Sequence, residues 1–287
     1  MSRLQELEKT KIGVEAMVQM SSVFEGIASM KIAKIKNQVL QATLFFDDLW
    51  KIYTQLRVDS LFRFGRNEGR DEEVIDKELY IIITAEGGFS GDIDQKLIRY
   101  MLENYEAEKH DIIVIGHHGA VQLAQKNISF KKYFKLPEKD QNINVTPIIK
   151  YVQQYRTASV FYQQYVSLMV QDVRKISLSK AVADQGRKTE RSDEVISEAN
   201  YIFEPTTYAV VDHLERSMMQ IMIEQLILDS KLAQYASRFR AMSASHQMAD
   251  EQLGDVNLRF NRAKRAIKDE RLKEIVNGLR KASRAVS

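Results

Sequence analysis

The chain has 287 residues, of which 44% are hydrophobic and 28% charged, proportions typical of a globular protein with one or two domains. Because there is no cysteine, a disulfide framework and thiolate metal sites are excluded, and a net charge of +3 gives no sign of a nucleic-acid-binding protein. No apolar run approaches the roughly 20 residues that cross a bilayer, and residues 1–10 lack the apolar core of a secretory signal, so we expect a cytosolic or peripheral protein without a nucleic-acid partner.

Residues 1–60 predict a long N-terminal helix. Between Leu4 and Val58 there is no proline, which would cost about 3 kcal/mol inside a helix, and only Gly13 and Gly26 weaken the helical propensity. Apolar residues recur along this stretch and offer a face for another helix. They are Met17, Met20, Val23, Phe24, Ile27, Met30, Leu40, Leu44, Leu49, Ile52 and Leu56.

Residues 76–205 follow a different pattern, in which apolar β runs alternate with amphipathic stretches. The predicted strands are 79–84, 111–115, 159–166 and 168–178, the predicted helices are 93–108 and 120–126, and a polar hairpin is expected at 183–193. Strand, helix, strand and helix in this order are typical of a small parallel sheet. We therefore expect an inserted Rossmann-like α/β domain.

Residues 206–287 predict a second long helix. Stepping alternately three and four residues from Val211 to Ile267 meets an apolar side chain at every step except Gln225 and His246. The residues met are Val211, Leu214, Met218, Ile221, Gln225, Leu228, Leu232, Tyr235, Phe239, Met242, His246, Ala249, Leu253, Val256, Phe260, Ala263 and Ile267. A repeat of 3.5 residues held over so many heptads specifies a left-handed coiled coil.

These three segments predict the fold class: α/β with a long helical coiled coil. Such a long C-terminal helix needs a partner, and the N-terminal helix is the other long proline-free segment. We expect the two ends to pair as an antiparallel coil, with the α/β domain inserted between them. Two separate helical domains are the alternative.

Three motifs could carry chemistry, and each has a simpler structural interpretation. Glu86–Gly91 lies where a phosphate-binding loop would, but it lacks the glycine spacing of the known loops, which favours a tight strand-to-helix turn. His117-His118 has no third ligand nearby in the sequence, so no metal site is expected. The adjacent carboxylates Asp47-Asp48 and Glu72-Glu73 are expected to be solvated. The sequence thus predicts no catalytic site, cofactor or metal.

Basic residues gather near the end of the C-terminal helix. They include Arg262, Lys264, Arg265, Lys268, Arg271 and Lys273. Cations near a helix C-terminus complement its dipole, which is one explanation. The other is a basic surface that binds acidic loops of a partner, and charge alone does not separate the two.

Several segments, in order along almost the whole chain, resemble the gamma subunit of F-type ATP synthases. The closest are Phe260–Ala266 with Glu274–Gly278, which are similar to the family's Tyr-Asn-Lys-Ala-Arg-Gln-Ala and Glu-Ile-Val-x-Gly. Weaker likenesses lie at Thr84–Gly91, Tyr162–Gln171, Tyr201–Pro205 and Arg238–Met242. Residues 21–31 resemble the family's N-terminal motif, which ends in a lysine matched by Lys31.

The resemblance implies a noncatalytic central shaft that turns inside a hexamer of alternating alpha and beta ATPase subunits. It also implies an epsilon-type subunit and a membrane ring as further partners, and a peripheral position on the cytoplasmic side of the membrane. By position, the family's hexamer contacts fall on Arg262, Lys264 and Arg265, where Arg265 replaces a glutamine, and on Lys31.

Two alternatives stay open. In the N-terminal motif Ser22 replaces a lysine and Gly26 a methionine, so the shaft of a specialised F-type-like motor with another output is one of them. The other is a coiled-coil scaffold that carries a Rossmann-like ligand-sensing domain.

Overall fold

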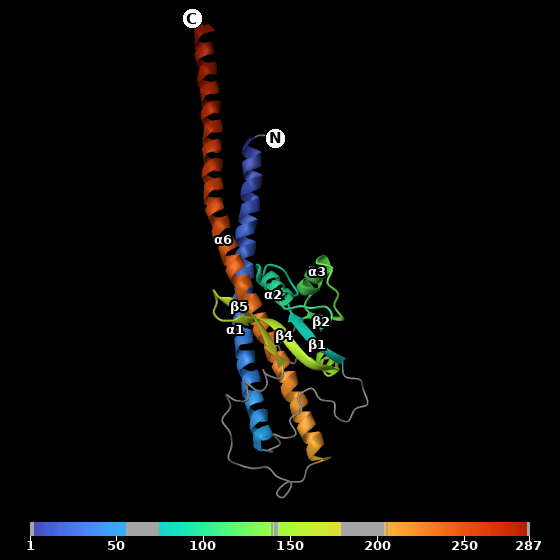
Figure 1. Ribbon diagram of the computed structural model, residues 1–287. Coiled ribbons are helices and arrows are strands. Elements are labelled where there is room, and N and C mark those ends of the chain that lie inside the picture. The colour runs from blue at the N-terminus through green and yellow to red at the C-terminus, as the bar shows by residue number, and fades with distance from the viewer. Residues whose placement is uncertain are drawn as a thin grey trace. The chain divides into compact units, whose positions relative to one another are not determined.

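The computed structural model describes residues 3–55, 75–138, 140, 143–178, 204 and 206–285 (Figure 1). Two compact units divide the chain: residues 1–27 with 240–287, and residues 28–239. The predicted hairpin at 183–193 and the Glu72-Glu73 pair lie outside the described residues. None of the helices in the described ranges combines the length and the apolar character that a membrane span needs.

The C-terminal helix is confirmed as a single element, α6, from Thr207 to Ala285. Every residue of the three-and-four series from Val211 to Ile267 is buried or half-buried, including the two polar ones, Gln225 and His246. Residues 268–280, which follow this series, are all exposed, among them Leu272, at 63%. The heptad pattern therefore identified the packed face of this helix correctly.

The N-terminal helix, α1, runs from Arg3 to Gln55, but the face expected to pack is largely the exposed one. Met20, Val23 and Met30 are 56%, 60% and 68% exposed. Most of the buried and half-buried residues instead fall in two series, each with a spacing of seven: Leu7, Val14, Ser21, Ala28, Ile35, Ala42 and Leu49, and Lys11, Val18, Glu25, Ile32, Val39, Phe46 and Tyr53. The packed positions thus include small residues such as Ser21 and Ala28, which allow close approach of another helix.

The pairing of α1 with α6 is antiparallel, as expected. In the unit formed by 1–27 and 240–287, the Lys11 ammonium lies 5.7 Å from the centre of the Phe260 ring, and Glu25 lies 3.5 Å from His246. In the other unit, Gln225 donates a hydrogen bond of 2.7 Å to Thr43. Residue numbers thus rise along one helix as they fall along the other.

The inserted segment forms a five-stranded mixed sheet in the order β3-β2-β1-β4-β5. The strands are β1 Ile75–Ile83, β2 His110–Ile115, β3 Lys132–Phe134, β4 Tyr155–Tyr165 and β5 Gln171–Ser177. The helices are α2 Ile93–Leu102, α3 His117–Gln125 and α4 Thr146–Val152. All neighbouring strands are parallel except β4 and β5, which are antiparallel.

Alternate residues of β1 enter two different cores, because successive side chains of a strand point to opposite faces. Leu79, Ile81 and Ile83 join the core that includes α4, α6 and residues of α1. Tyr80 and Ile82 join the core under α2 and α3. The continuous apolar run of this strand reflects burial on both faces of the sheet.

Some predicted boundaries were wrong. The helix expected at 93–108 ends at Leu102, because Asn104 donates a side-chain hydrogen bond of 2.9 Å to the carbonyl of Tyr100 and ends the helical ladder. The strand expected at 168–178 begins at Gln171, since residues 166–170 form the turn that follows β4. Two short elements, β3 and α4, were not predicted at all.

Candidate functional site

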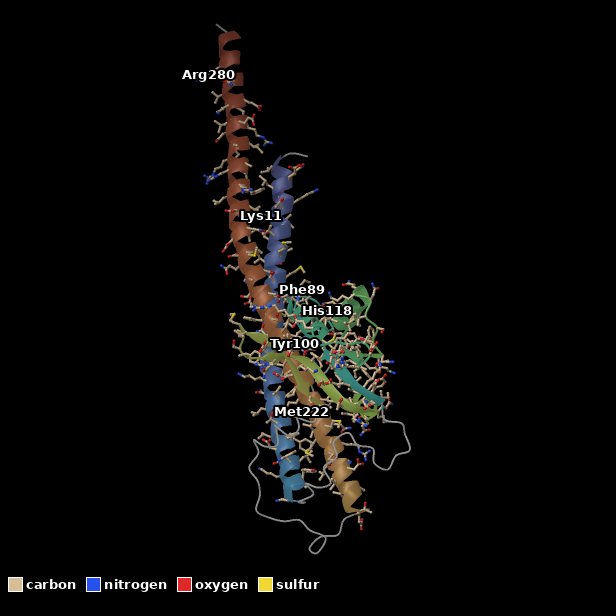
Figure 2. The ribbon with its side chains drawn as sticks, viewed as in Figure 1. Lys11, Phe89, Tyr100, His118, Met222 and Arg280 are labelled. Atoms are coloured by element: carbon tan, nitrogen blue, oxygen red, sulfur yellow. The ribbon has the colours of Figure 1, made fainter. Side chains whose placement is uncertain are left out.

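The predicted cationic site lies on one exposed stretch of α6. Arg262, Lys264 and Arg265 are all exposed. The ammonium of Lys264 lies 6.0 Å from the centre of the Phe260 ring, and the Lys11 ammonium of α1 lies 5.7 Å from the same ring. Figure 2 labels Lys11 on α1. The three cations thus project from a helix that the packing of Phe260 helps to hold in place.

The fourth predicted residue, Lys31, has a partner within the chain. Its ammonium lies 3.1 Å from Oδ2 of Asp140, whose side chain is 1% exposed. The other carboxylate oxygen of Asp140 accepts a hydrogen bond from Lys231, a residue of α6 that is itself buried. Lys31 therefore joins α1 and α6 through the segment around Asp140, a role that the sequence did not suggest.

A second open surface is apolar and lies on α1. Met17, Met20, Val23 and Ile27, which we call the apolar stripe, are 59%, 56%, 60% and 41% exposed. Contiguous exposed apolar side chains of this kind mark interaction sites in soluble proteins. The sequence instead predicts these residues to lie on the packed face of the coil, and that prediction is wrong for all four.

The Glu86–Gly91 loop is confirmed as a strand-to-helix turn, and it is fastened to α6. The guanidinium of Arg238 donates hydrogen bonds to the carbonyls of Gly88 at 3.1 Å and Gly87 at 3.2 Å. The hydroxyl of Ser237 donates one of 2.7 Å to the carbonyl of Ser90. Three backbone carbonyl groups of the loop therefore point toward α6.

Beneath this loop lies a buried polar network that links the α/β domain to α6. Its centre is Asp94, 3% exposed, which accepts hydrogen bonds from the backbone N–H of Ala85 at 3.2 Å and from the Gln163 side chain at 2.8 Å. Gln163 accepts in turn from Ser230 and, at 3.2 Å, from Gln234. A fully partnered network of this kind fixes one packing arrangement.

His118 belongs to the same network, so one of the two adjacent histidines noted in the sequence has a structural role. Its Nδ1 lies 3.0 Å from Oδ2 of Asp94. The hydrogen bond with Asp94 raises the pKa of His118 above its ordinary value, although partial burial opposes the change. Within the described residues no group of three His, Cys, Asp or Glu side chains is placed to hold a metal ion.

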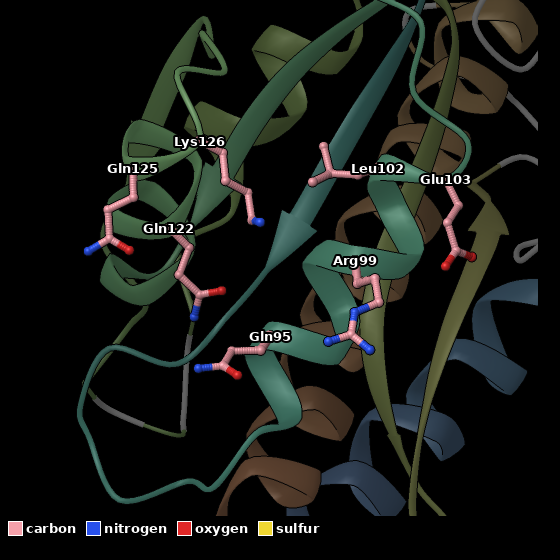
Figure 3. A pocket seen from close by; sticks show the side chains of 7 residues that line it. All are labelled: Gln95, Arg99, Leu102, Glu103, Gln122, Gln125 and Lys126. Atoms are coloured by element: carbon pink, nitrogen blue, oxygen red, sulfur yellow. The ribbon is translucent and has the colours of Figure 1, made fainter.

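A groove of about 650 Å³ lies between α2 and α3 (Figure 3). Its lining is mainly polar, with Arg99 and Glu103 on α2 and with Gln122, Gln125 and Lys126 on or just after α3. No serine, cysteine or histidine lines it, so the Ser–His and Cys–His pairs of nucleophilic catalysis are absent from this groove.

Comparison with known proteins places this arrangement in a family. A family model described as ATP synthase matches residues 3–280, nearly the whole chain. The chain belongs to the ATP synthase gamma-chain family. As a member of this family it is the central-stalk rotor, a noncatalytic subunit of an F-type ATP synthase.

Two related gamma chains have low sequence identity to this chain, but the similarity covers nearly the full length of both proteins. The ATP synthase gamma chain of Geotalea uraniireducens is 22% identical over 97% of this chain and 98% of its own length. That of Streptococcus agalactiae serotype III is 24% identical, with 96% and 97% covered. The sequence similarity to gamma chains therefore extends over nearly the whole chain.

Solved structures of ATP synthases share the fold. A chain from the rotor of the Euglena gracilis mitochondrial ATP synthase superposes with a TM-score of 0.58 at 15% identity, over 92% of this chain and 98% of that one. A chain from the central stalk and c-ring of the Tetrahymena thermophila enzyme gives 0.55 at 14% identity, over 78% and 98%. The gamma-chain fold is thus retained at very low identity.

Proposed function

We propose that the coil of α1 and α6 turns within a hexamer of alternating alpha and beta ATPase subunits, and so couples ATP hydrolysis or synthesis to rotation. The observation that carries this proposal is the one-sided packing of the two helices. In the described residues of the unit formed by 1–27 and 240–287, each helix packs on the other with one seam of heptad positions and leaves most of its other residues exposed, as a shaft surrounded by other subunits requires.

The exposed faces have two kinds of surface suited to such a partner. Arg262, Lys264 and Arg265 supply positive charge, which complements acidic loops of the beta subunits and fixes the relative orientation of the subunits. The apolar stripe of α1 supplies hydrophobic area, which gains free energy when another surface covers it. Because Lys31 is engaged by Asp140, we assign it to the integrity of the shaft rather than to a direct hexamer contact.

We further propose that the α/β domain binds an epsilon-type subunit and a membrane ring on the cytoplasmic side of the membrane. The polar network from Asp94 to Gln234 supports this assignment, because a domain that passes torque to a ring must be fixed to the helices that turn. Its partnered, buried side chains resist sliding between the domain and α6.

Co-purification tests the assignment to a rotary complex. We expect one copy of this chain with six nucleotide-binding subunits. A stable dimer of the chain that binds a nucleotide by itself would instead support the ligand-sensing scaffold.

Charge reversal tests the proposed contact of Lys264 and Arg265 with the hexamer. The double variant Lys264→Glu, Arg265→Glu should assemble normally but should lose a large part of the ion pumping driven by each ATP hydrolysed. The matched control is Lys126→Glu, Lys132→Glu, which makes the same charge change at exposed positions of the α/β domain. Equal pumping efficiency in wild type and the α6 variant would remove Lys264 and Arg265 from the proposed contact.

A further inference from the structure

The contact between the α/β domain and α6 contains a buried carboxylate, that of Asp94. Its side chain is 4% exposed, and it accepts hydrogen bonds from the backbone N–H of Ala85 and from the Gln163 amide. Neither donor is a cation, and a buried carboxylate without a counter-charge is destabilising. In the part of the chain that the structure describes, the one basic side chain within ion-pair distance of Asp94 is His118, at 3.0 Å.

The counter-charge at Asp94 therefore depends on pH, because histidine gains and loses its proton near neutrality. His118 is half-buried near the start of α3 (Figure 2). Its backbone N–H donates a hydrogen bond of 3.0 Å to the carbonyl of Ala85, and the N–H of Gly119 donates one of 2.9 Å to the Thr84 hydroxyl. These bonds hold the imidazole beside Asp94 in either protonation state.

Asp94 fixes the orientation of the Gln163 amide. The amide nitrogen of Gln163 donates to Asp94, so its carbonyl oxygen is left to accept from Ser230 and, at 3.2 Å, from Gln234 on α6. An amide turned the other way would set its carbonyl oxygen against the carboxylate, and two acceptors form no hydrogen bond. The bonds to α6 therefore depend on Asp94 remaining an ionised acceptor.

Three charged side chains face His118, each from a different element: Asp94 on α2, Glu86 in the loop after β1 and Arg238 on α6. The hydrogen bond with Asp94 has the largest effect and raises the pKa of His118 above its ordinary value of about 6.5. Glu86 adds to the rise, whereas partial burial and Arg238 oppose it. Because the pKa is raised in the folded chain, protonation contributes stability that is complete below the unfolded value and is lost as the pH rises through the folded value.

We propose that His118 is a pH-sensitive clamp, whose protonation tightens the attachment of the α/β domain to α6 in this rotor. The proton completes an ion pair between His118 and Asp94. Asp94 then holds Gln163 with its carbonyl oxygen toward Ser230 and Gln234. Loss of the proton leaves Asp94 buried without a counter-charge and weakens the same contact. The inference goes beyond the proposed function, because it concerns regulation within the chain and requires no partner subunit.

Hydrogen exchange of the Ala85 backbone N–H, which donates to Asp94, measures the clamp locally. After correction for the intrinsic pH dependence of exchange, protection of this N–H in the full-length wild-type chain should fall severalfold between about pH 6 and about pH 8. The variant His118→Gln keeps a hydrogen-bond donor but carries no charge. Its protection should be low and equal at the two pH values.

The adjacent histidine provides the matched control, since the side chain of His117 is exposed. His117→Gln should lose protection between the two pH values as wild type does. Asp229, which also titrates in this range, is present in all three proteins and cancels in the comparison. A wild-type pH dependence in His118→Gln would overturn the clamp, because another group would then be responsible.

The wild-type chain allows a second test that needs no variant. An NMR titration of the His118 ring should give a pKa above the ordinary value of about 6.5. A pKa at or below that value would overturn the clamp even if His118→Gln did not fold.

Discussion

The ammonium nitrogen of Lys31 lies 3.1 Å from Oδ2 of Asp140, and Lys231 binds the other oxygen of the same carboxylate. Burial alone would raise the pKa of Asp140, but the hydrogen bonds from the two lysines outweigh it and lower the pKa. Lys231 also donates to the carbonyl of Pro137 at 2.8 Å. One buried carboxylate thus joins α1, α6 and the segment before α4.

Removal of this carboxylate should be strongly destabilising. In Asp140→Asn the ammonium of Lys231, whose side chain is 4% exposed, loses this counter-charge while it stays buried. We expect a loss of about 3–5 kcal/mol in the free energy of unfolding, measured by urea denaturation at pH 7.

The double variant Asp140→Asn, Lys231→Met separates the lost charge pair from damage to the fold. Lys231→Met removes the buried ammonium that Asp140→Asn leaves without its counter-charge, so the second substitution should recover much of the lost stability. A double variant no more stable than Asp140→Asn would contradict this account.

Lys31 has a partner within the chain that the sequence did not indicate. The N-terminal motif suggested a contact with another subunit, whereas the partner found in the chain lies 109 residues away in an irregular segment. No periodic pattern links such residues. Gln163, Ser230 and Gln234 were missed for the same reason, although Ser230 and Gln234 are polar residues four apart in a mostly buried part of α6.

The two long helices differ in how well the sequence predicted their packed faces. The packed face of α6 followed from its sequence because large apolar residues hold the heptad spacing. On α1 several large apolar residues, such as Met20 and Met30, are exposed, whereas the packed positions include the small residues Ser21 and Ala28 as well as Phe46. Hydrophobicity alone therefore selected the wrong face, since an exposed apolar surface and a packed one have the same periodicity.

Gln38 should be replaceable with a gain in stability. Its side chain is 8% exposed, and neither amide atom has a hydrogen-bond partner among the described residues. Because unpartnered buried polar groups cost about 1–3 kcal/mol, Gln38→Leu should raise the free energy of unfolding by about 1 kcal/mol or more. The control is Gln225→Leu, which also removes the hydrogen bond to Thr43 and should gain less. Loss of stability in Gln38→Leu would show that its amide has a partner.

Gly116, which follows β2, should tolerate no side chain. Its φ is +101°, and a Cβ there would lie 2.1 Å from the carbonyl oxygen of Thr84, so backbone would have to move. We expect Gly116→Ala to cost about 4 kcal/mol or more in the free energy of unfolding, measured by thermal and urea denaturation.

Gly254 is the matched control because the same substitution should have the opposite effect there. It lies on an exposed part of α6, and a Cβ added to it would meet no heavy atom within 4 Å. Alanine has the higher helix propensity, so Gly254→Ala should stabilise the protein by about 0.5–1 kcal/mol. Similar effects at both positions would contradict the steric explanation.

Asp229 on α6 should make stability depend on pH. Burial raises its pKa to about 6, although the backbone N–H of Tyr165 donates to its carboxylate at 3.4 Å and opposes the rise. Because the folded-state pKa exceeds the unfolded value, the protonated carboxyl contributes stability that is complete below about pH 4. This contribution is lost as the pH rises through about 6.

Asp229→Asn removes the ionisation and keeps an oxygen acceptor for Tyr165. We expect the variant to match wild type near pH 4 and to exceed its free energy of unfolding at pH 8 by on the order of 2 kcal/mol. The titration of Asp140, common to both proteins, cancels in this difference. A difference between Asp229→Asn and wild type that stays constant from pH 4 to 8 would mean that Asp229 titrates alike in the folded and unfolded chains.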